Sequence, residues 1–568
     1  MAIVDASTGP AVIVAVAVVV VVVSTLLWTA MAQLVWRPYA VGRALGQQGV
    51  RGPAYRLLVG NIGEANEMRA AASGGVLDRR CHDVVPRVLP HYRAWMSRYG
   101  KVFVSWTGPF PALCVGDYAM AKEILADRTG LYAKPDPGAS ILALFGNGLA
   151  FVNGDDWARH RRVVHPAFAM DKLKMMAKTM AECARKVIQA WEARAAAAAD
   201  GERMVQVEVG EQFQELTADV ISHTAFGSSY RQGKEVFVAQ RELQYIAMSA
   251  LNSVRIPGSQ YIPTKANIRR RQLAKKVRGT LMAIIRERQA TAAAAKEDRG
   301  YGNDLLGLML EANAAAGGGE KSMTMDEIVD ECKTFFFAGH DTTSHLLTWA
   351  MFLLGTHPEW QQRLREEVLR ECCGGGGGDT EALPNGDALN KLKLVKSSTK
   401  LKAGAVIAGD EQHVFDDNLC ADDDGAVRDA AAVRAGEHAG EDGDGVRVPK
   451  GTMTMMPVAI LHRDADVWGA DAGEFDPLRF RGGVNKAAAH AGALLAFSLG
   501  QRSCIGQDFA MMEAKTTLAM ILRRFAFEVS PEYVHAPLDL LTLQPKCGLP
   551  MHGWRNVGGL RATVLVHL

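Results

Sequence analysis

The sequence predicts a mainly α-helical protein with a small β-rich lobe, preceded by a single N-terminal transmembrane helix. Three observations lead to this fold class. Residues 11–35 contain a long apolar run that no charged residue interrupts, apolar residues in the middle of the chain recur with helical spacing, and residues 101–116 alternate as in a small hairpin. The 568 residues are 48% hydrophobic, which is ample for a large core. We expect a membrane anchor at 1–36, a linker at 37–52 and one large domain at 53–568.

The apolar run is long enough to cross a bilayer, which takes roughly 20 apolar residues. Asp5 is the only charged residue before it, so the basic start of a cleaved signal peptide is missing. Arg37, Arg43 and Arg51 follow the run, and such positive charge favours the cytosolic side of a membrane. The pattern predicts an uncleaved single-pass anchor in the endoplasmic reticulum membrane, with the large domain on its cytosolic face.

Charge and cysteine content argue against several kinds of partner. The 64 Lys and Arg residues nearly balance the 62 Asp and Glu residues, and the net charge of +2 gives no reason to expect nucleic acid binding. The nine cysteines form no Cys-x-x-Cys pair and no regular spacing. That distribution speaks against a disulfide framework and against a zinc site.

The most informative stretch runs from Phe497 to Gly506 and leads into a helical pattern. Gly500 and Gly506 allow a tight turn and close approach to a flat ring, and the helix dipole favours a Cys504 thiolate. A thiolate below a haem iron favours O–O bond cleavage, while Arg502 would meet a haem propionate and Phe497 would cover the sulfur. The alternative is an ordinary buried cysteine beside a surface arginine, and the five fixed positions favour the metal ligand.

These residues resemble the haem-binding loop of the cytochrome P450 monooxygenases. The resemblance implies the cytochrome P450 fold, with haem b as cofactor and Cys504 as its iron ligand. It also implies that one oxygen atom of O2 enters a C–H bond of a small molecule, with electrons from NADPH through a membrane-bound NADPH–cytochrome P450 reductase. Pro166–Lys174 and Glu331–His340 further resemble the plant branch that hydroxylates fatty acids and small hormones.

Trp157 and Arg161 are spaced so that they share one face of a helix. An indole N–H and a guanidinium can together hold a carboxylate, and beside the cysteine loop this favours a haem propionate over a surface arginine packed on a tryptophan. Further basic residues nearby suit either a plain solvated face or a dock for an acidic electron donor. These are Arg159, Arg162, Lys172, Lys174 and Lys178.

A capping box at Thr324–Glu327 predicts a long helix that ends near Gly355. Its apolar middle contains Asp341 and Thr342, and buried polar groups are costly unless they have partners. One interpretation is a threonine bonded to the preceding turn and an aspartate turned to solvent. The other is a local helix opening at Gly339, with Thr342 and Asp341 relaying protons for oxygen activation. Resemblance to the family's oxygen-activation motif favours the second.

The resemblance fails at one place. Arg479 corresponds to an arginine that packs against a Glu-x-x-Arg pair, but that pair is missing from its expected position near residues 401–404. Residues 396–445 instead have the Asp-, Ala- and Gly-rich composition of a disordered segment. We expect Arg479 to lack a buried carboxylate partner, a loss of about 3–5 kcal/mol.

Glu367 and Arg370 do spell Glu-x-x-Arg, but they lie in an earlier helix, where we expect an ordinary helical ion pair. Three explanations compete for residues 396–445: an intron read through or mis-joined, a splice form without activity, or an unusual active enzyme. The abrupt edges of the segment favour the first. We therefore expect this exact chain to bind haem poorly or not at all, and a correctly joined counterpart to be active.

The sequence predicts a hydrophobic substrate without identifying it. The apolar residues Phe335–Phe337 and the membrane anchor favour a fatty acid, with a cytokinin, gibberellin or brassinosteroid as the second candidate. A hypothesis of another class is a catalytically inactive, membrane-anchored protein that keeps the fold and binds partners or ligands, because the Glu-x-x-Arg motif is absent.

Overall fold

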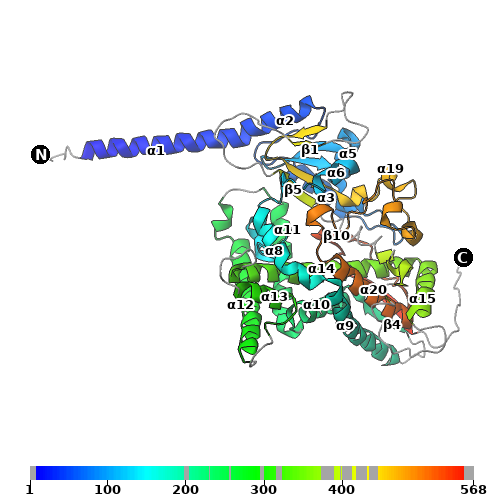
Figure 1. Cartoon of the computed structure of the whole chain (residues 1–568). Coiled ribbons are helices and arrows are strands. Elements are labelled where there is room, and N and C mark those ends of the chain that lie inside the picture. The colour runs from blue at the N-terminus through cyan, green and yellow to red at the C-terminus, as the bar shows by residue number, and fades with distance from the viewer. Residues whose placement is uncertain are drawn as a thin grey trace.

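The computed structural model of the chain describes residues 8–197, 204–228, 230–254, 258–294, 300–314, 323–372, 389, 391–396, 398–399, 412–416, 431–433 and 445–555. These residues form helices and four small β-sheets, as the sequence predicts. In Figure 1, helices fill the lower part of the molecule, strands β1 and β5 lie at the top, and α14 runs between them. Helix α1 projects away from the body.

The helices of the described residues, apart from short 3-10 and π turns, have the following bounds: α1 Thr8–Met31, α2 Arg37–Gln47, α3 Ile62–Ser73, α4 Val85–Val88, α5 Pro90–Tyr99, α6 Tyr118–Leu125, α7 Gly138–Phe145, α8 Gly154–Val164, α9 Met170–Ala197, α10 Val209–Phe226, α11 Tyr230–Leu251, α12 Lys265–Ala294, α13 Leu305–Ala314, α14 Met325–Thr356, α15 Pro358–Cys372, α18 Val458–Leu461, α19 Ala465–Trp468 and α20 Gln507–Arg524. The strands are β1 Val102–Thr107, β2 Phe110–Val115, β3 Tyr132–Ala133, β4 Met204–Glu208, β5 Gln412–Asp416, β6 Ala431–Val433, β7 Val446–Val448, β8 Met453–Met456, β9 Phe525–Val529, β10 Pro537–Leu540, β11 Thr542–Pro545 and β12 Pro550–Arg555.

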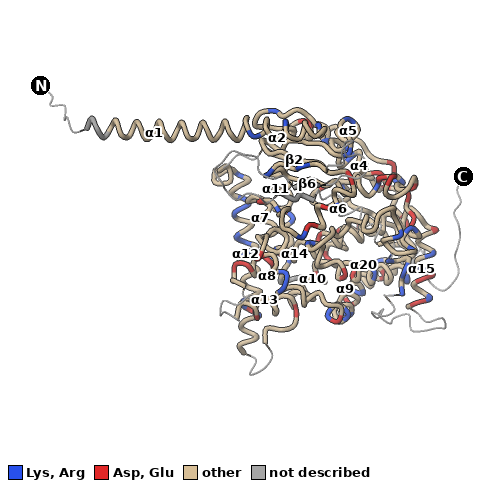
Figure 2. Tube along the Cα trace, turned by 45° about the horizontal axis from the view of Figure 1, so that its top comes forward, with Lys and Arg blue, Asp and Glu red and all other residues tan. Residues whose placement is uncertain are grey.

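The N-terminal helix extends beyond the expected anchor. It continues from α1 through one π-helical turn at Ala32–Trp36 into α2, and Figure 2 shows α1 free of charged residues. Its stretch Val12–Gln47 is long and apolar enough to cross a membrane. Residues 37–47, expected as part of a linker, are instead helix α2, because Val41 and Leu45 on one face are buried against the large domain.

The predicted hairpin is formed by β1 and β2, which pair antiparallel with Val102 opposite Val115. It opens a five-stranded sheet of order β1-β2-β8-β5-β3, in which β8 joins β2 in parallel. The central residues of both strands are buried, because α5 contacts β1 and α2 contacts β2. The anchor helix and the sheet are therefore joined through α2.

Helix α14 begins at the predicted capping box. The Glu327 amide donates to the Thr324 hydroxyl at 3.2 Å, and the Glu327 carboxylate accepts from the Thr324 amide at 2.7 Å. The helix is unbroken to Thr356, so the opening predicted at Gly339 is absent. A glycine at this position has another explanation. An added Cβ would lie 2.6 Å from the Ile221 side chain of α10, so Gly339 permits close packing of α14 against α10.

Most of the segment 396–445 lies outside the described residues, including the place expected for the missing Glu-x-x-Arg pair. Two strands inside it are described, β5 and β6. Strand β5 pairs antiparallel with β8, with His413 opposite Met455, and also with β3. Its sequence His413-Val-Phe contains residue types that favour strands. These residues therefore differ from the disorder predicted for the whole segment.

Candidate active site

A cavity of about 880 Å³ lies where α14, α8 and the loop before α20 meet. Most of the site residues predicted from the sequence line it, although they come from distant parts of the chain. Those lining residues are Trp157, Arg161, Thr342, Phe497, Arg502, Cys504 and Gly506. Asp341 and Gly500 are not among the lining residues.

The cysteine loop is held by its backbone. Gly500 has a φ of 71°, a left-handed conformation, and an added Cβ would lie 2.3 Å from the Leu125 carbonyl oxygen, so only glycine fits there. The Cys504 amide donates to the Phe497 carbonyl at 2.9 Å and closes the turn. Gly506 has a φ of −87°, so the backbone turn does not itself require glycine at that position.

Cys504 lines the cavity and is exposed on that side, while protein atoms crowd its sulfur from the other sides. Burial raises the pKa of the Cys504 thiol, and the Gly506 amide and the Arg161 guanidinium only partly oppose this. The Gly506 amide at the start of α20 thus favours the thiolate, as the sequence predicts, but its effect on the pKa is smaller than that of burial. A metal ion at the sulfur would supply the missing positive charge, because a coordinating thiol is deprotonated outright.

Two arginines from different elements meet at one tryptophan of the cavity wall. The guanidinium carbon of Arg502 lies 5.1 Å from the centre of the Trp157 ring and that of Arg161 lies 5.7 Å from it. Arg161 also donates to the Ser503 carbonyl at 2.9 Å, and Arg502 donates to the Val152 carbonyl at 2.9 Å. Helix α8 and the cysteine loop thus place two cations at the same edge of the cavity, which suits an anionic group.

The Asp341 and Thr342 side chains point in different directions. The Thr342 hydroxyl donates to the Ala338 carbonyl at 2.7 Å, one turn back, and lines the cavity. Asp341 is buried and accepts from the Thr542 hydroxyl at 2.6 Å. Burial opposes ionisation, but His345 and the Thr542 hydroxyl more than offset it and lower the pKa of Asp341. The threonine therefore matches the first interpretation above, whereas the aspartate is not turned to solvent.

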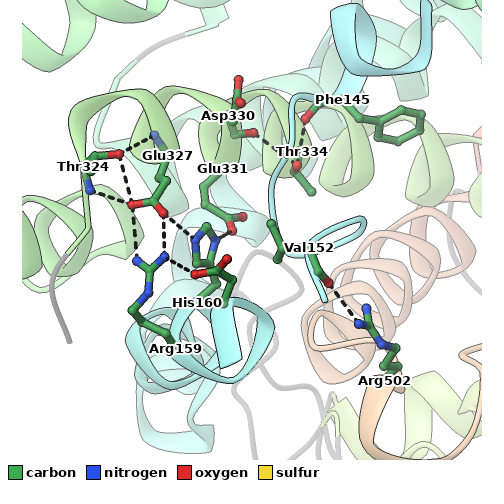
Figure 3. A network of polar contacts seen from close by, with 11 residues as sticks. Phe145, Val152, Arg159, His160, Thr324, Glu327, Asp330, Glu331, Thr334 and Arg502 are labelled. Atoms are coloured by element: carbon green, nitrogen blue, oxygen red, sulfur yellow. Dashed lines mark hydrogen bonds and ion pairs between the residues drawn. The ribbon is translucent and has the colours of Figure 1, made fainter. Parts of the chain in front are cut away.

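Reasoning from the sequence missed a buried polar network beside the cavity (Figure 3). His160, between Trp157 and Arg161, faces Glu331 of α14 at 2.6 Å. Arg159, expected on a solvated basic face, instead binds Glu327 with two hydrogen bonds of 2.6 and 3.2 Å. Glu327 and Glu331 lie one helical turn apart on α14, and this spacing was the available signal.

Arg479 has partners, although the expected Glu-x-x-Arg pair falls outside the described residues. Its guanidinium lies 2.8 Å from the Asp471 carboxylate and donates to the carbonyls of Trp468 at 2.6 Å and Asp471 at 2.7 Å. Arg479 therefore keeps a carboxylate contact, while the position of the buried partner whose loss the sequence predicts falls outside the described residues. The substitute is more exposed than a buried ion pair, because 60% of the Asp471 side chain is accessible to solvent.

Glu367 and Arg370 do not form the ion pair predicted for them. Glu367 is buried, and its carboxylate accepts from the Leu394 amide at 2.8 Å and the Val395 amide at 3.0 Å. Arg370 instead binds the neighbouring Glu371 at 2.9 Å. Glu367 therefore anchors the backbone of residues 393–396. The Glu-x-x-Arg spacing gave no indication of this role.

The residues around the cavity fit a haem bound through sulfur. A thiol faces the cavity, and two guanidinium groups stand at one edge, where a ring bearing carboxylates needs cations. At Gly506, an added Cβ would have no protein atom closer than 3.9 Å, the nearest being the Cys504 sulfur and Phe168. The loop thus leaves room for a flat ring beside the sulfur.

Comparison with known proteins gives one family for nearly the whole chain. The cytochrome P450 family model matches residues 88–398 and 442–548. The chain is 40% identical to Cytochrome P450 709B1 of Arabidopsis thaliana over 550 residues, which cover 96% of this chain and 98% of that relative. It is 40% identical to Cytochrome P450 734A6 of Oryza sativa subsp. japonica over 528 residues, 91% of each chain. It is 37% identical to a cytokinin hydroxylase of Arabidopsis thaliana over 523 residues, 90% of this chain and 92% of the relative. The chain therefore belongs to the cytochrome P450 family of haem-dependent monooxygenases.

Proposed function

We propose that this protein hydroxylates a hydrophobic small molecule, and that the Cys504 thiolate would hold the iron of haem b. The observation that carries the proposal is the convergence of the Cys504 thiol, two arginines and Thr342 on a single cavity. A haem bound there supplies the redox chemistry that activates O2 with electrons from a redox partner. The volume of the cavity suits a small-molecule site, which typically measures about 300–1,000 Å³.

The roles of the other site residues follow from their positions. Trp157, Arg161 and Arg502 would bind the propionate carboxylates, because they present an indole and two cations at one edge. The Thr342 hydroxyl offers a proton donor and acceptor at the cavity wall. Asp341 does not line the cavity, so we assign it to the proton supply behind Thr342, where it holds a negative charge against Thr542 and His345.

The reduced, carbon-monoxide-treated full-length protein tests this assignment. We expect the red-shifted band of a thiolate-ligated haem in the wild type and its loss in Cys504→Ala. Cys547 is also exposed, so Cys547→Ala is a matched control that should keep the band. An unchanged spectrum in Cys504→Ala would remove Cys504 as the ligand.

The segment 396–445 is proposed to be foreign to the family pattern and to weaken haem binding. The family match stops at residue 398 and resumes at 442, which supports an origin in a retained or mis-joined intron. The Arg479–Asp471 contact limits the damage, so we expect weakened rather than abolished haem uptake. The test compares the haem content of this chain with that of a version joined across the gap. Equal haem content would refute the proposal, and a catalytically inactive protein would show no turnover in either version.

The substrate is proposed to be a small plant hormone, and a fatty acid is the second candidate. Similarity to a cytokinin hydroxylase supports the first. The second rests on Arg69 of α3, which lines the cavity and donates to Asn252 at 2.9 Å; a guanidinium there suits a carboxylate. Spectral binding shifts with a cytokinin, a gibberellin, a brassinosteroid and a long-chain fatty acid separate the candidates. A fatty-acid shift that Arg69→Gln abolishes would favour the second.

The protein is proposed to reside in the endoplasmic reticulum membrane with the large domain in the cytosol, served by NADPH–cytochrome P450 reductase. The charge-free helix α1 and the arginines that follow it support this orientation. Exposed Lys174 and Lys178 of α9 offer an electrostatic dock. In sealed microsomes, added protease should digest the large domain. The double change Lys174→Glu and Lys178→Glu should raise the reductase concentration needed for half-maximal turnover.

A further inference from the structure

The polar network at the crossing of α8 and α14 has a fully buried centre. The His160 Nδ1 atom lies 2.6 Å from a Glu331 carboxylate oxygen, and the two side chains are 1% and 0% exposed. The other ring nitrogen, Nε2, lies 3.4 Å from Glu327. A titratable pair so completely removed from water is costly unless its geometry is good, so its presence beside the cavity needs a reason.

The network fixes the end of α14 as well as α8. The Glu327 carboxylate accepts two hydrogen bonds from the Arg159 guanidinium of α8, and it also completes the capping box with Thr324. Figure 3 shows these groups in one continuous set of contacts, with His160 between the two glutamates. The first two turns of α14 are therefore tied to α8 by two ion-paired groups.

The loop between α7 and α8 joins the same cluster to the cysteine loop. At Gly148, an added Cβ would lie 2.9 Å from Glu331 and 2.5 Å from the Thr334 hydroxyl, so the loop packs directly on the pair. A few residues later, Val152 and Asn153 accept hydrogen bonds from Arg502 at 2.9 and 2.6 Å. Figure 3 shows this loop running from Thr334 towards Arg502.

Helix α8 therefore presents two functional faces. His160 is buried against α14, while Trp157 and Arg161 line the cavity. The helix spans only 11 residues, so a rotation that releases His160 also moves the cavity-lining pair. We propose that the His160–Glu331 ion pair is the positioning element that sets the rotation of α8 and holds Trp157 and Arg161 at the cofactor. This inference rests on the role proposed above for those two residues.

The charges around the pair favour one shared proton. Burial disfavours the imidazolium, but Glu331 and then Glu327 outweigh it and raise the pKa of His160. Burial also raises the pKa of Glu331, against the opposing effect of His160 and the Leu149 amide. Arg159 on α8 and Asp330 on α14 are the other charged groups nearby. As the pH rises through the raised pKa of His160, the proton is lost and the ion pair disappears with it.

Glu331→Gln tests the proposal in the full-length chain, because it removes the charge and keeps a hydrogen-bonding side chain. We expect haem to dissociate roughly ten- to one-hundred-fold faster, as for other groups that orient ligand-binding residues. Transfer of haem to apomyoglobin measures the rate. Glu242→Gln is the matched control, since Glu242 forms an exposed pair with Arg269, and it should leave the rate unchanged.

The pH profile separates positioning from general stability. In the wild type, haem release should accelerate as the pH rises through the raised pKa of His160. In Glu331→Gln, the acceleration should begin at lower pH, because His160 has lost its nearest anion. A global loss of stability would increase release at every pH without moving the profile. An unmoved profile would overturn the proposal.

A second readout does not depend on haem. Hydrogen exchange in the cofactor-free protein should show loss of protection confined to 154–164 in Glu331→Gln. If the wild type takes up no haem, the proposed function fails for this chain, whereas the exchange result still decides the role of the pair. Unchanged protection of α8 in Glu331→Gln would overturn the inference in either case.

Discussion

Two of the helices at the cavity, α14 and α20, differ in how their buried acidic side chains are partnered. On α14, Glu331 meets His160 at 2.6 Å and Asp341 accepts from Thr542 at 2.6 Å. On α20, Glu513 is just as buried, but neither of its carboxylate oxygens has a hydrogen-bond partner within the described part of the chain. Burial therefore raises the pKa of Glu513 well above its ordinary value.

The difference shows how each wall of the cavity is organised. A buried carboxylate with a basic partner ties two elements together, whereas one without a partner takes up a proton and behaves as a neutral polar group. Side-chain ion pairs therefore position α14 against α8. On the α20 side, the conformation depends on the backbone turn at Gly500 and on apolar packing.

The largest effect is expected from breaking the α14 pair. Glu331→Ala removes the carboxylate at 2.6 Å from the buried His160 and leaves that of Glu327 at 3.4 Å. Removing one member of a buried ion pair typically costs about 3–5 kcal/mol. Urea unfolding of the detergent-solubilised protein, followed by tryptophan fluorescence, measures the change in the free energy of unfolding. A loss below about 1 kcal/mol, the typical value for an exposed pair, would contradict the comparison.

The next effect concerns the turn on the α20 side. Gly500→Ala forces a side chain into a left-handed conformation and within 2.3 Å of the Leu125 carbonyl. We expect a loss of about 2–4 kcal/mol from the two causes together. Gly506→Ala is the control, because its Cβ meets no protein atom closer than 3.9 Å. It should leave the stability of the cofactor-free protein unchanged and weaken haem binding, and equal destabilisation by both variants would argue against this account of the loop.

The sequence predicted the features that local patterns determine, and it missed the contacts between residues far apart in the chain. Local signals predicted α14, because its capping box and apolar spacing lie within the helix itself. The fixed spacing of the Phe497–Gly506 loop likewise predicted the loop residues that line the cavity, which are Phe497, Arg502, Cys504 and Gly506. The His160–Glu331 pair joins positions 171 residues apart, and no local pattern reports such a contact. The contact between Asp471 and Arg479 was not predicted either, because Asp471 belongs to no motif.

Glu513 gives a smaller effect that depends on pH. Its folded-state pKa is raised above 4.5, so above that pH the native state binds more protons at this site than the unfolded state. The free energy of unfolding should then fall by up to about 1.4 kcal/mol per pH unit from this group, until the pH passes the raised pKa. Glu513→Gln should remove this dependence, so the difference between variant and wild type should grow as the pH rises from 4.5. Parallel pH profiles would show that Glu513 has a partner after all.

The smallest effect tests the region behind the cysteine loop. Asp471→Asn removes the carboxylate next to Arg479 but keeps the backbone carbonyls of Trp468 and Asp471 as acceptors. Because the Asp471 side chain is 60% exposed, we expect a loss of no more than about 1 kcal/mol, and less at high salt, where exposed charges are screened. Urea unfolding at low and high salt measures both. Asp476→Asn controls for the charge change, because an asparagine can still accept from the Leu478 amide as Asp476 does. A salt-independent loss of about 3–5 kcal/mol would mean that Asp471 acts as a buried partner, and that Arg479 has recovered the ion pair that the segment 396–445 lacks.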